Sequence, residues 1–271
     1  MSWIYKRGKR LTYLTLPEWE KQGIQIGFST REGGAGDAPY DSLNLGLHVG
    51  DDPETVLLNR ERWLLEWNAS WNDVVIGEQV HGVKVHVAQA SDSGRGGRDL
   101  KSVLPGVDGL VTQSSQGLMA FFADCVPVYF YHPVLGAVGI AHAGWKGTVG
   151  KIVLEVLRKL EVLGGKPNEC WAALGPSIGP CCYEVDEHVM RLFSEAFNKT
   201  PFIRLTRPGH GMLDLWEANR QLLLAGGVLP ENIASASICT ACHTDRFFSH
   251  RREGPNTGRM AGWIRRRVEE E

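Results

Sequence analysis

Two apolar runs each end at a possible metal ligand: Met119-Ala-Phe-Phe-Ala-Asp-Cys125 and Gly136-Ala-Val-Gly-Ile-Ala-His142. A third run, Val74-Val-Ile-Gly-Glu-Gln-Val-His-Gly82, ends in the same way at His81. Such runs indicate buried strands, which bring distant residues together at one sheet edge, where loops carry chemistry. His81, Cys125 and His142 therefore predict one metal site. Their two nitrogen donors and one sulfur donor suit a catalytic zinc whose fourth position stays open.

The rest of the chain alternates between strand and helix patterns. Short apolar or β-branched runs predict strands at 24–29, 74–80, 83–88, 107–112, 118–123, 126–131, 137–142, 171–174 and 234–239. Helices are expected from Pro53, from Thr148 to the glycines at 164 and 165, and after the capping residues Asp186 and Asp214. Strands dominate the first half and alternate with helices in the second, which favours a mixed α/β or α+β fold.

Bulk properties restrict the class of protein. A length of 271 residues is compatible with a single domain over 1–271. The net charge of −2 gives no electrostatic footprint for nucleic acid, and no run of about 18 apolar residues predicts a membrane span. The first ten residues lack the apolar stretch of a secretory signal. Six cysteines without such a signal favour free thiols in the cytoplasm.

Two segments stand out as irregular or solvated. The glycine-rich stretch 91–99 is expected to be a flexible loop. The arginines at 265–267 are followed, after Val268, by the glutamates at 269–271, and this charge pattern predicts the solvated end of a helix.

Six motifs occur in a recognisable order. They are Gly27-Phe-Ser-Thr-Arg-Glu-Gly-Gly34, Ser42-Leu-Asn-Leu-Gly46, Gln79-Val-His-Gly82, Ala123-Asp-Cys-Val-Pro127, Ala141-His-Ala-Gly-Trp-Lys-Gly147 and Leu174-Gly-Pro-Ser-Ile-Gly-Pro-Cys-Cys-Tyr183. This set resembles the laccase-domain family, also called polyphenol oxidases, and the resemblance extends from about Gly27 to Gly262. It implies a sandwich of mixed β-sheets flanked by helices. It also implies a zinc-dependent purine nucleoside phosphorylase that acts on inosine, adenosine and methylthioadenosine, with adenosine deaminase activity.

The metal site has alternatives. On spacing alone, the favoured interpretation is that Cys125 is a small buried hydrophobe and that the histidines are structural. The resemblance shifts the balance toward zinc at His81, Cys125 and His142. Copper is the rival metal, because one thiolate and two imidazoles can hold a single copper ion. A multicopper oxidase, however, usually needs His-x-His pairs, and none of the nine histidines forms one.

Other polar residues are candidates for substrate contacts. Asp124 abuts the thiolate ligand and is either a turn carboxylate or a group that handles a proton. Arg31, Lys146 and Arg251 are the cations that could position phosphate, although Arg31 taken alone is typical of a solvated turn.

The glycine-rich turn that begins at Ser29 could let the backbone approach an anion. Asn44 could contact a ribose or a base, or it could simply be a turn residue. The resemblance moves these residues toward a substrate pocket without ranking them.

The remaining cysteines form two short motifs. Cys181 and Cys182 are adjacent in sequence. Each could line the substrate pocket or simply pack in the protein interior, and packing is expected for at least one of them. Cys239-Thr-Ala-Cys242-His243 has the spacing of a haem-attachment motif, which requires export. A redox dithiol is a better interpretation, and plain packing is better still.

Two other functions fit the same residues. A metal-free cysteine hydrolase or deamidase would use Cys125 as nucleophile, with His142 or His81 as base. A non-catalytic factor in cell-wall biogenesis or division would use zinc as a structural staple. The expected partners are purine nucleosides and phosphate, with no nucleic acid or membrane, and the sequence leaves the oligomeric state open.

Overall fold

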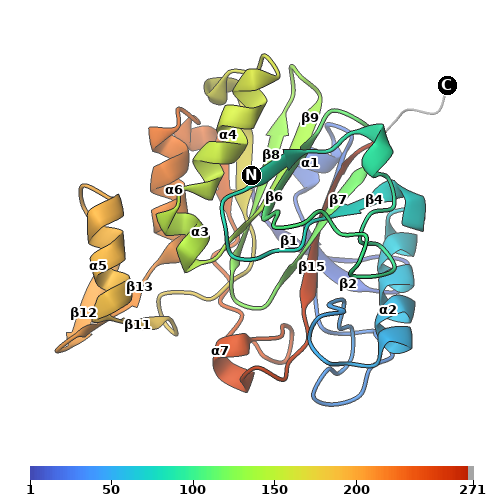
Figure 1. Ribbon diagram of the computed structural model, residues 1–271, viewed down its shortest axis with the longest axis horizontal. Coiled ribbons are helices and arrows are strands. Elements are labelled where there is room, and N and C mark those ends of the chain that lie inside the picture. Colours follow the sequence, from blue (N-terminus) through green and yellow to red (C-terminus); the bar gives the residue numbers. More distant parts are fainter. Residues whose placement is uncertain (268–271) are drawn as a thin grey trace.

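The computed structural model describes residues 1–267 and contains two six-stranded sheets packed face to face (Figure 1). The first sheet has the order β1 (Ile4–Arg7), β2 (Thr12–Thr15), β3 (Ile24–Ser29), β15 (Met260–Arg266), β7 (Gly117–Phe122), β4 (Val74–Ile76). The second has the order β14 (Ile233–Ser235), β10 (Trp171–Leu174), β8 (Val126–His132), β9 (Ala137–Ala143), β6 (Gly109–Thr112), β5 (Val85–Val87). Both sheets are mixed, because each contains parallel and antiparallel neighbours. The expected sandwich of mixed sheets is confirmed.

The central strands are buried on both faces because both faces are covered. In β8, Val126, Val128 and Phe130 point toward the helices, whereas Tyr129 and Tyr131 point into the space between the sheets. Successive side chains of a strand alternate between faces, so one continuous apolar run serves two cores. The other central strands, β7, β9 and β15, have the same two-sided burial.

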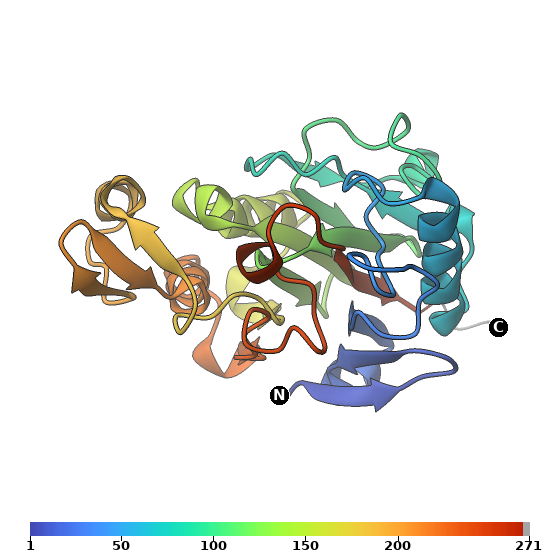
Figure 2. The ribbon, with the colours of Figure 1, turned by 90° about the horizontal axis from the view of Figure 1, so that it is seen from below.

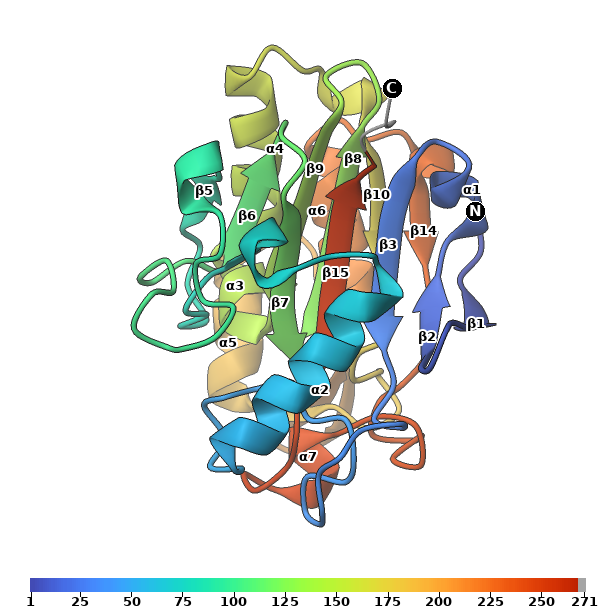
Figure 3. The ribbon, with the colours of Figure 1, turned by 90° about the vertical axis from the view of Figure 1, so that its right-hand side faces the viewer.

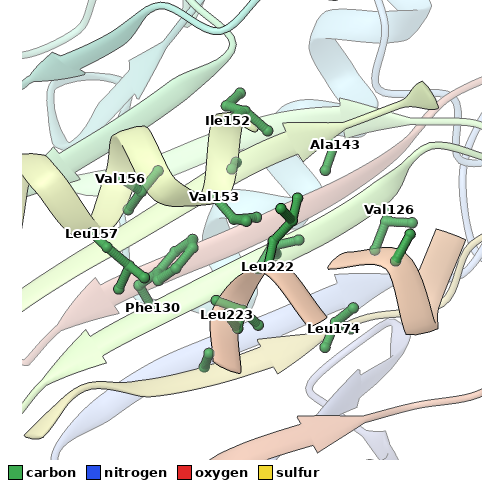
Figure 4. Close-up of a cluster of buried hydrophobic side chains, with 14 of the residues drawn as sticks. Val126, Phe130, Ala143, Ile152, Val153, Val156, Leu157, Leu174, Leu222 and Leu223 are labelled. Atoms are coloured by element: carbon green, nitrogen blue, oxygen red, sulfur yellow. The ribbon is translucent and has the colours of Figure 1, made fainter. Parts of the chain in front are cut away.

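Helices cover the outer face of the second sheet. α4 (Ile152–Val162) packs over β9, β6 and β5, and α6 (Leu215–Ala225) packs beside it. Their apolar side chains share one buried cluster with the sheet, as Figure 4 shows for Val153, Val156, Leu222 and Leu223. A short helix, α3 (Trp145–Val149), precedes α4. The helix expected from Thr148 is therefore two helices, because Lys151 between them adopts a left-handed backbone conformation with a φ of 65°.

On the opposite side, α2 (Pro53–Glu66) lies across the outer face of the first sheet (Figure 3). Its residues Trp63 and Leu64, with Trp67 just beyond its end, pack against Met119, Trp263 and their neighbours. The helix expected from Pro53 is confirmed, and the Asp52 side chain caps it by accepting a hydrogen bond from the Thr55 amide.

A smaller unit projects from one end of the sandwich (Figure 2). It consists of α5 (Glu187–Ala196) and the three-stranded sheet β11 (Glu184–Asp186), β13 (His210–Leu213), β12 (Ile203–Arg207). The expected caps Asp186 and Asp214 accept hydrogen bonds from Val189 and Glu217. Two further short helices are α1 (Pro17–Glu20) and α7 (His250–Glu253). No helix within residues 1–267 is long and apolar enough to cross a bilayer.

Two expectations need correction. The arginines at 265 and 266 end a central strand, β15, and not a helix; the glutamates at 269–271 lie outside the described residues. Arg265 fits in the sheet because its guanidinium bonds Asp73 and the Ser115 carbonyl. The stretch 91–99 is also less free than its glycines suggest, because the buried Arg60 donates hydrogen bonds to the carbonyls of residues 96 and 97.

The chain crosses between the two sheets at the predicted ligands. β7 belongs to the first sheet and β8 to the second, so Ala123-Asp124-Cys125 is a crossing. The segment from β4 to β5, which carries His81, crosses in the same direction. His142 of β9 pairs with Pro127 of β8, and Pro127 comes two residues after Cys125, so His142 and Cys125 are neighbours across the two strands. The topology thus gathers all three donors at one end of the sandwich.

Candidate metal centre and its cavity

His81, Cys125 and His142 converge in space. Their donor atoms all lie within 4.8 Å of one another, and the two imidazole rings are 4.8 Å apart between centroids, nearly edge to face. His142 is buried on β9, Cys125 is partly buried, and His81 is exposed. Three donors on a wall open to solvent leave a position for a further ligand, which is the arrangement of catalytic zinc sites.

Asp108 organises two of the three ligands. Its buried carboxylate lies 2.9 Å from Nδ1 of His142, which fixes that ring and leaves Nε2 for a metal. The same carboxylate accepts hydrogen bonds from the amides of Val80, His81 and Gly82, at 2.8–3.0 Å. Burial by itself raises the pKa of Asp108, but the hydrogen bonds from His142 and from these amides lower it overall. A carboxylate behind a ligating histidine is the usual outer partner of a metal site.

The ligand-bearing loops have an unusual backbone. Gln79, His81 and Asp124 all have positive φ values, of 53°, 61° and 85°. Residues with side chains rarely adopt this conformation, and where it is found it often marks a functional site. Gln79 is held by two hydrogen bonds, both 2.8 Å long, between its side-chain amide and the backbone of Phe121. This pairing fixes the His81 loop against the end of β7.

Gly144 gives the three ligands the room to meet. A β-carbon at this position would lie 2.7 Å from Sγ of Cys125 and 3.3 Å from Cδ2 of His81. A side chain here would therefore push into the donors. The soft thiolate, the two imidazoles and the histidine–carboxylate pair fit a bound metal ion, and both zinc and copper accept this donor set.

The donors also perturb one another. Burial raises the pKa of the Cys125 thiol, but the charge on His142 and hydrogen bonds from His142 and His81 outweigh it, and the pKa falls to about 6. Burial lowers the pKa of His142, yet Cys125 and Asp108 raise it to about 9. The thiol is thus held ready to ionise, as a metal ligand or a nucleophile must be.

The donors line a cavity of about 420 Å³, which is within the range of roughly 300–1,000 Å³ of small-molecule sites. Phe121, Trp145 and Tyr183 supply aromatic surface to it. Asp124, Gln79, His48, His250, Arg251 and Arg259 supply polar groups. The cavity therefore combines aromatic surface with positive charge beside the donor set.

Asp124 lies in the cavity wall between the two sheets. Its carboxylate oxygens accept hydrogen bonds from the Thr240 hydroxyl and the Arg251 amide, both at 2.6 Å. Its backbone carbonyl accepts from Ile178. Each carboxylate oxygen keeps a second acceptor position, so Asp124 holds two segments together and can still accept a proton from a ligand.

Arg259 and Arg251 bring positive charge to the cavity. Within the described residues, Arg259 uses only Nη1 for side-chain hydrogen bonds, to the carbonyls of residues 257 and 258. The rest of its guanidinium is available to a ligand. Arg251 stacks over Tyr183 at 4.9 Å. Desolvation, together with Arg259 and Arg60, lowers the pKa of His48 to about 4, so this imidazole is neutral at pH 7.

The structure brings only some of the predicted residues to the cavity. Asp124 and Arg251 line it with the three donors. Arg31 lies elsewhere, with its guanidinium engaged by Asp41, Glu253 and the Thr244 carbonyl. Lys146 is exposed beside Trp145 and is not in the cavity lining. The substrate contacts expected of Arg31 and Lys146 stay predictions.

Ser29 and Asn44 are buried and support the cavity from behind. The Ser29 hydroxyl accepts a hydrogen bond from the Ala261 amide. The Asn44 side chain accepts one from the Arg259 amide and donates one to Asp51. Neither is in the cavity lining. Their direct contact with a substrate also stays a prediction.

Sequence reasoning missed Asp108, His48, His250, Tyr183, Thr240 and Arg259. For Asp108 a signal was present, because an acid that begins an apolar strand run is rarely buried without a partner. Arg259 and Thr240 gave none, since only the packing of distant loops brings them to the site.

Comparison with known proteins finds relatives that match nearly the whole chain. A family model described as "Multi-copper polyphenol oxidoreductase laccase" matches residues 25–267. Purine nucleoside phosphorylase YlmD of Geobacillus stearothermophilus is 44% identical over 256 residues, which cover 91% of this chain and 92% of that protein. Adenosine deaminase RL5, from an unknown prokaryotic organism, is 35% identical over 250 residues, which cover 91% and 95%. The crystal structure of YlmD from Geobacillus stearothermophilus matches with a TM-score of 0.93 at 40% identity, covering 98% of this chain and 99% of that one.

Proposed function

The chain belongs to the multi-copper polyphenol oxidoreductase laccase family, and from that premise we propose that it is a purine nucleoside phosphorylase with adenosine deaminase activity. In phosphorolysis, phosphate attacks the anomeric carbon of inosine, adenosine or methylthioadenosine; the bond to the purine breaks, and the products are the free base and the sugar 1-phosphate. One observation carries the proposal: the donor set His81, Cys125 and His142 lies in the wall of a cavity that also contains arginines and aromatic rings.

We infer that His81, Cys125 and His142 would hold zinc, because two imidazole nitrogens and one thiolate are donors that zinc prefers. Zinc held there would act as a Lewis acid and lower the pKa of a water molecule, which is the chemistry that deamination needs. The chain's own part is to keep the ligands in place. Asp108 orients His142 and the His81 loop, and Gly144 leaves space for the donors to approach.

Arg259 and Arg251 are the cations that we assign to phosphate. Both line the cavity, whereas Arg31 and Lys146 do not. A guanidinium matches phosphate oxygens in a forked geometry, and Arg259 has donors to spare within residues 1–267. The rings of Phe121 and Tyr183 offer apolar faces on which a purine can stack. Such positioning of two reactants accounts for much of the rate in bimolecular transfers.

Asp124 is the group that we assign to proton handling. It lies in the cavity wall beside Cys125, and the Thr240 hydroxyl and the Arg251 amide orient it. In deamination, a carboxylate at this place would take a proton from the attacking water and deliver one to the leaving amine. In phosphorolysis, the carboxylate of Asp124 would repel phosphate, so phosphate would approach from the side of the cavity that carries the arginines.

The test is a pair of assays on one preparation. Inosine is incubated with and without phosphate, and adenosine is incubated in phosphate-free buffer. The proposal requires hypoxanthine from inosine only when phosphate is present, and inosine from adenosine without it. Base release without phosphate would instead indicate a nucleoside hydrolase, and inert nucleosides would favour a non-catalytic role.

A cytoplasmic location is also proposed, because all six cysteines are free thiols, as in reducing compartments.

A further inference from the structure

Four cysteines outside the cavity meet at one point. Cys181 and Cys182 follow β10, and Cys239 and Cys242 follow β14. All four sulfur atoms lie within 4.8 Å of one another, and Cys242 is 3.4 Å from both Cys181 and Cys182. The other two cysteines, Cys125 and Cys170, lie elsewhere. The packing expected for these thiols does not explain a cluster in which two members are exposed.

The spacing of the sulfur atoms matches a metal site. A zinc ion bound by four thiolates at about 2.3 Å places neighbouring sulfur atoms about 3.8 Å apart in tetrahedral geometry. Cys242 lies 3.4 Å from two of the other sulfur atoms, and no pair in the cluster is more than 4.8 Å apart, so the four atoms are close enough to share one ion. The sequence also has the form of half a zinc ribbon, because Cys239 and Cys242 are separated by two residues. Four soft sulfur donors in this arrangement select zinc over harder divalent cations.

Backbone interactions hold the cluster in place. β10 and β14 are parallel neighbours, and a further bridge between Ser177 and Cys239 extends the pair beyond the strands. Because parallel strands end at the same edge of a sheet, both cysteine pairs reach the same place. The Gly179 amide donates a hydrogen bond to Sγ of Cys239 at 3.2 Å. Such donors stabilise thiolates in metal sites.

We propose that Cys181, Cys182, Cys239 and Cys242 bind a second zinc ion, closed by four protein ligands and therefore structural. This ion joins the segment after β10 to the segment after β14. Both segments reach the cavity, since Ile178 lines it and Thr240 bonds Asp124. The second site thereby supports the wall that carries Asp124. The proposal does not depend on the reaction assigned to the cavity.

The first test is metal content of the full chain, purified without added metal and without chelator. Elemental analysis should find about two zinc ions per wild-type chain, one for each donor set. His81→Ala, which disables only the cavity site, should keep about one. Refilled with Co²⁺, this variant should show the intense visible absorption of a tetrathiolate cobalt site. One zinc per wild-type chain, or none in His81→Ala, overturns the proposal.

Cysteine variants locate the second ion. Cys181→Ala and Cys242→Ala should each lose about one zinc per chain and keep the ion of the cavity. Cys170→Ala is the matched control, because it removes a thiol outside both donor sets and should leave zinc content unchanged. If the cluster variants do not fold, the His81→Ala measurement still decides. Zinc content unchanged in Cys181→Ala and Cys242→Ala contradicts the assignment.

The oxidation state of the thiols gives a separate check on the wild-type protein. Alkylation under denaturing, non-reducing conditions with a chelator should label all six cysteines, since zinc thiolates are reduced. A disulfide recovered between the two cysteine pairs would show that the cluster is a redox pair, and would overturn the metal site.

Discussion

The metal-ligating side chains depend on partners that never touch the metal. Asp108 bonds His142 through its carboxylate and receives the amides of three consecutive residues around His81. One buried acid thus sets the ring orientation of one ligand and the loop conformation of another. Removing its charge should disturb both ligands while the core of the sandwich stays intact.

Asp108→Asn should weaken zinc binding at the cavity by roughly 10- to 100-fold, because the amide cannot accept from both the ring and the loop. A competition titration against a zinc chelator measures this. Asp92→Asn is the matched control: Asp92 also pairs with a histidine, His86, at 2.8 Å and accepts a backbone amide, but it lies outside the cavity. Equal zinc affinity in both variants would exclude the role given to Asp108.

Arg259→Ala should raise the KM for phosphate about ten- to a hundredfold, with a much smaller change in the KM for nucleoside. Loss of a charge-assisted hydrogen bond costs roughly 1.5–3 kcal/mol, which corresponds to that range. Arg31→Ala is the comparison. The sequence alone predicts a raised phosphate KM for it, whereas its contacts with Asp41 and Glu253 predict a lower melting temperature instead. An unchanged phosphate KM in Arg259→Ala would remove that residue from the phosphate site.

These residues show where sequence reasoning ends. Each of the three donors closes an apolar run, and buried strands meet at a common edge, which made them candidates. The family resemblance was needed to favour a metal site over structural roles, and the structure confirms that the three residues meet in space. Arg31 was a candidate and Arg259 was missed, because the local sequence around an arginine does not show what surrounds its guanidinium in the fold. What separates them is which carbonyls and carboxylates the fold places around each guanidinium, and these come from loops distant in the chain.

Among the larger pieces of the fold, the crossings between sheets matter most for the site. The β7–β8 crossing carries Cys125, and α3 begins directly after Gly144 at the end of β9. At Gly144, the start of α3 and the end of β9 come so close to the β7–β8 crossing that only glycine fits.

Gly144→Ala should leave the fold intact, because its backbone φ of −69° suits any residue. Its methyl group would nevertheless lie 2.7 Å from Sγ of Cys125 and displace that ligand. We expect a loss of cavity zinc and of both activities, without a loss of secondary structure. Gly82→Ala is the control, since a methyl group there meets nothing nearer than 3.4 Å. Zinc content and circular dichroism on both variants decide; full zinc in Gly144→Ala would contradict the geometry.

Strand β15 shows why a central element escaped the sequence analysis. Its apolar part, Met260–Ile264, is short and contains Gly262, while the arginines that follow are typical of a solvated end. Gly262 is required because a β-carbon there would lie 2.7 Å from the Tyr129 hydroxyl of the facing sheet. Neither that close approach nor the Arg265–Asp73 ion pair is visible in local sequence.

The molecule as a whole has a core that does not depend on metal. Apolar side chains fill the space between the sheets and beneath the helices on both outer faces. A chain of this size buries enough surface to fold without a bound ion. We propose that the chain forms one cooperative unit, which the cavity zinc stabilises only as a ligand of the folded state.

His81→Ala and His142→Ala should therefore lose phosphorolysis and deamination but remain folded. Each should melt in a single transition, a few degrees below the wild-type protein. Thermal melts and both assays on the same samples make the comparison. Unfolding of both variants would show that the cavity zinc is structural, and wild-type turnover in both would exclude the site from catalysis.

The most direct measurement is the phosphate-dependent cleavage of inosine by protein that has been stripped of metal and then refilled. We predict that the metal-free protein is inactive, that zinc restores phosphorolysis, and that copper restores far less. Full turnover without metal would contradict the account and favour Cys125 as a nucleophile with His142 as its base.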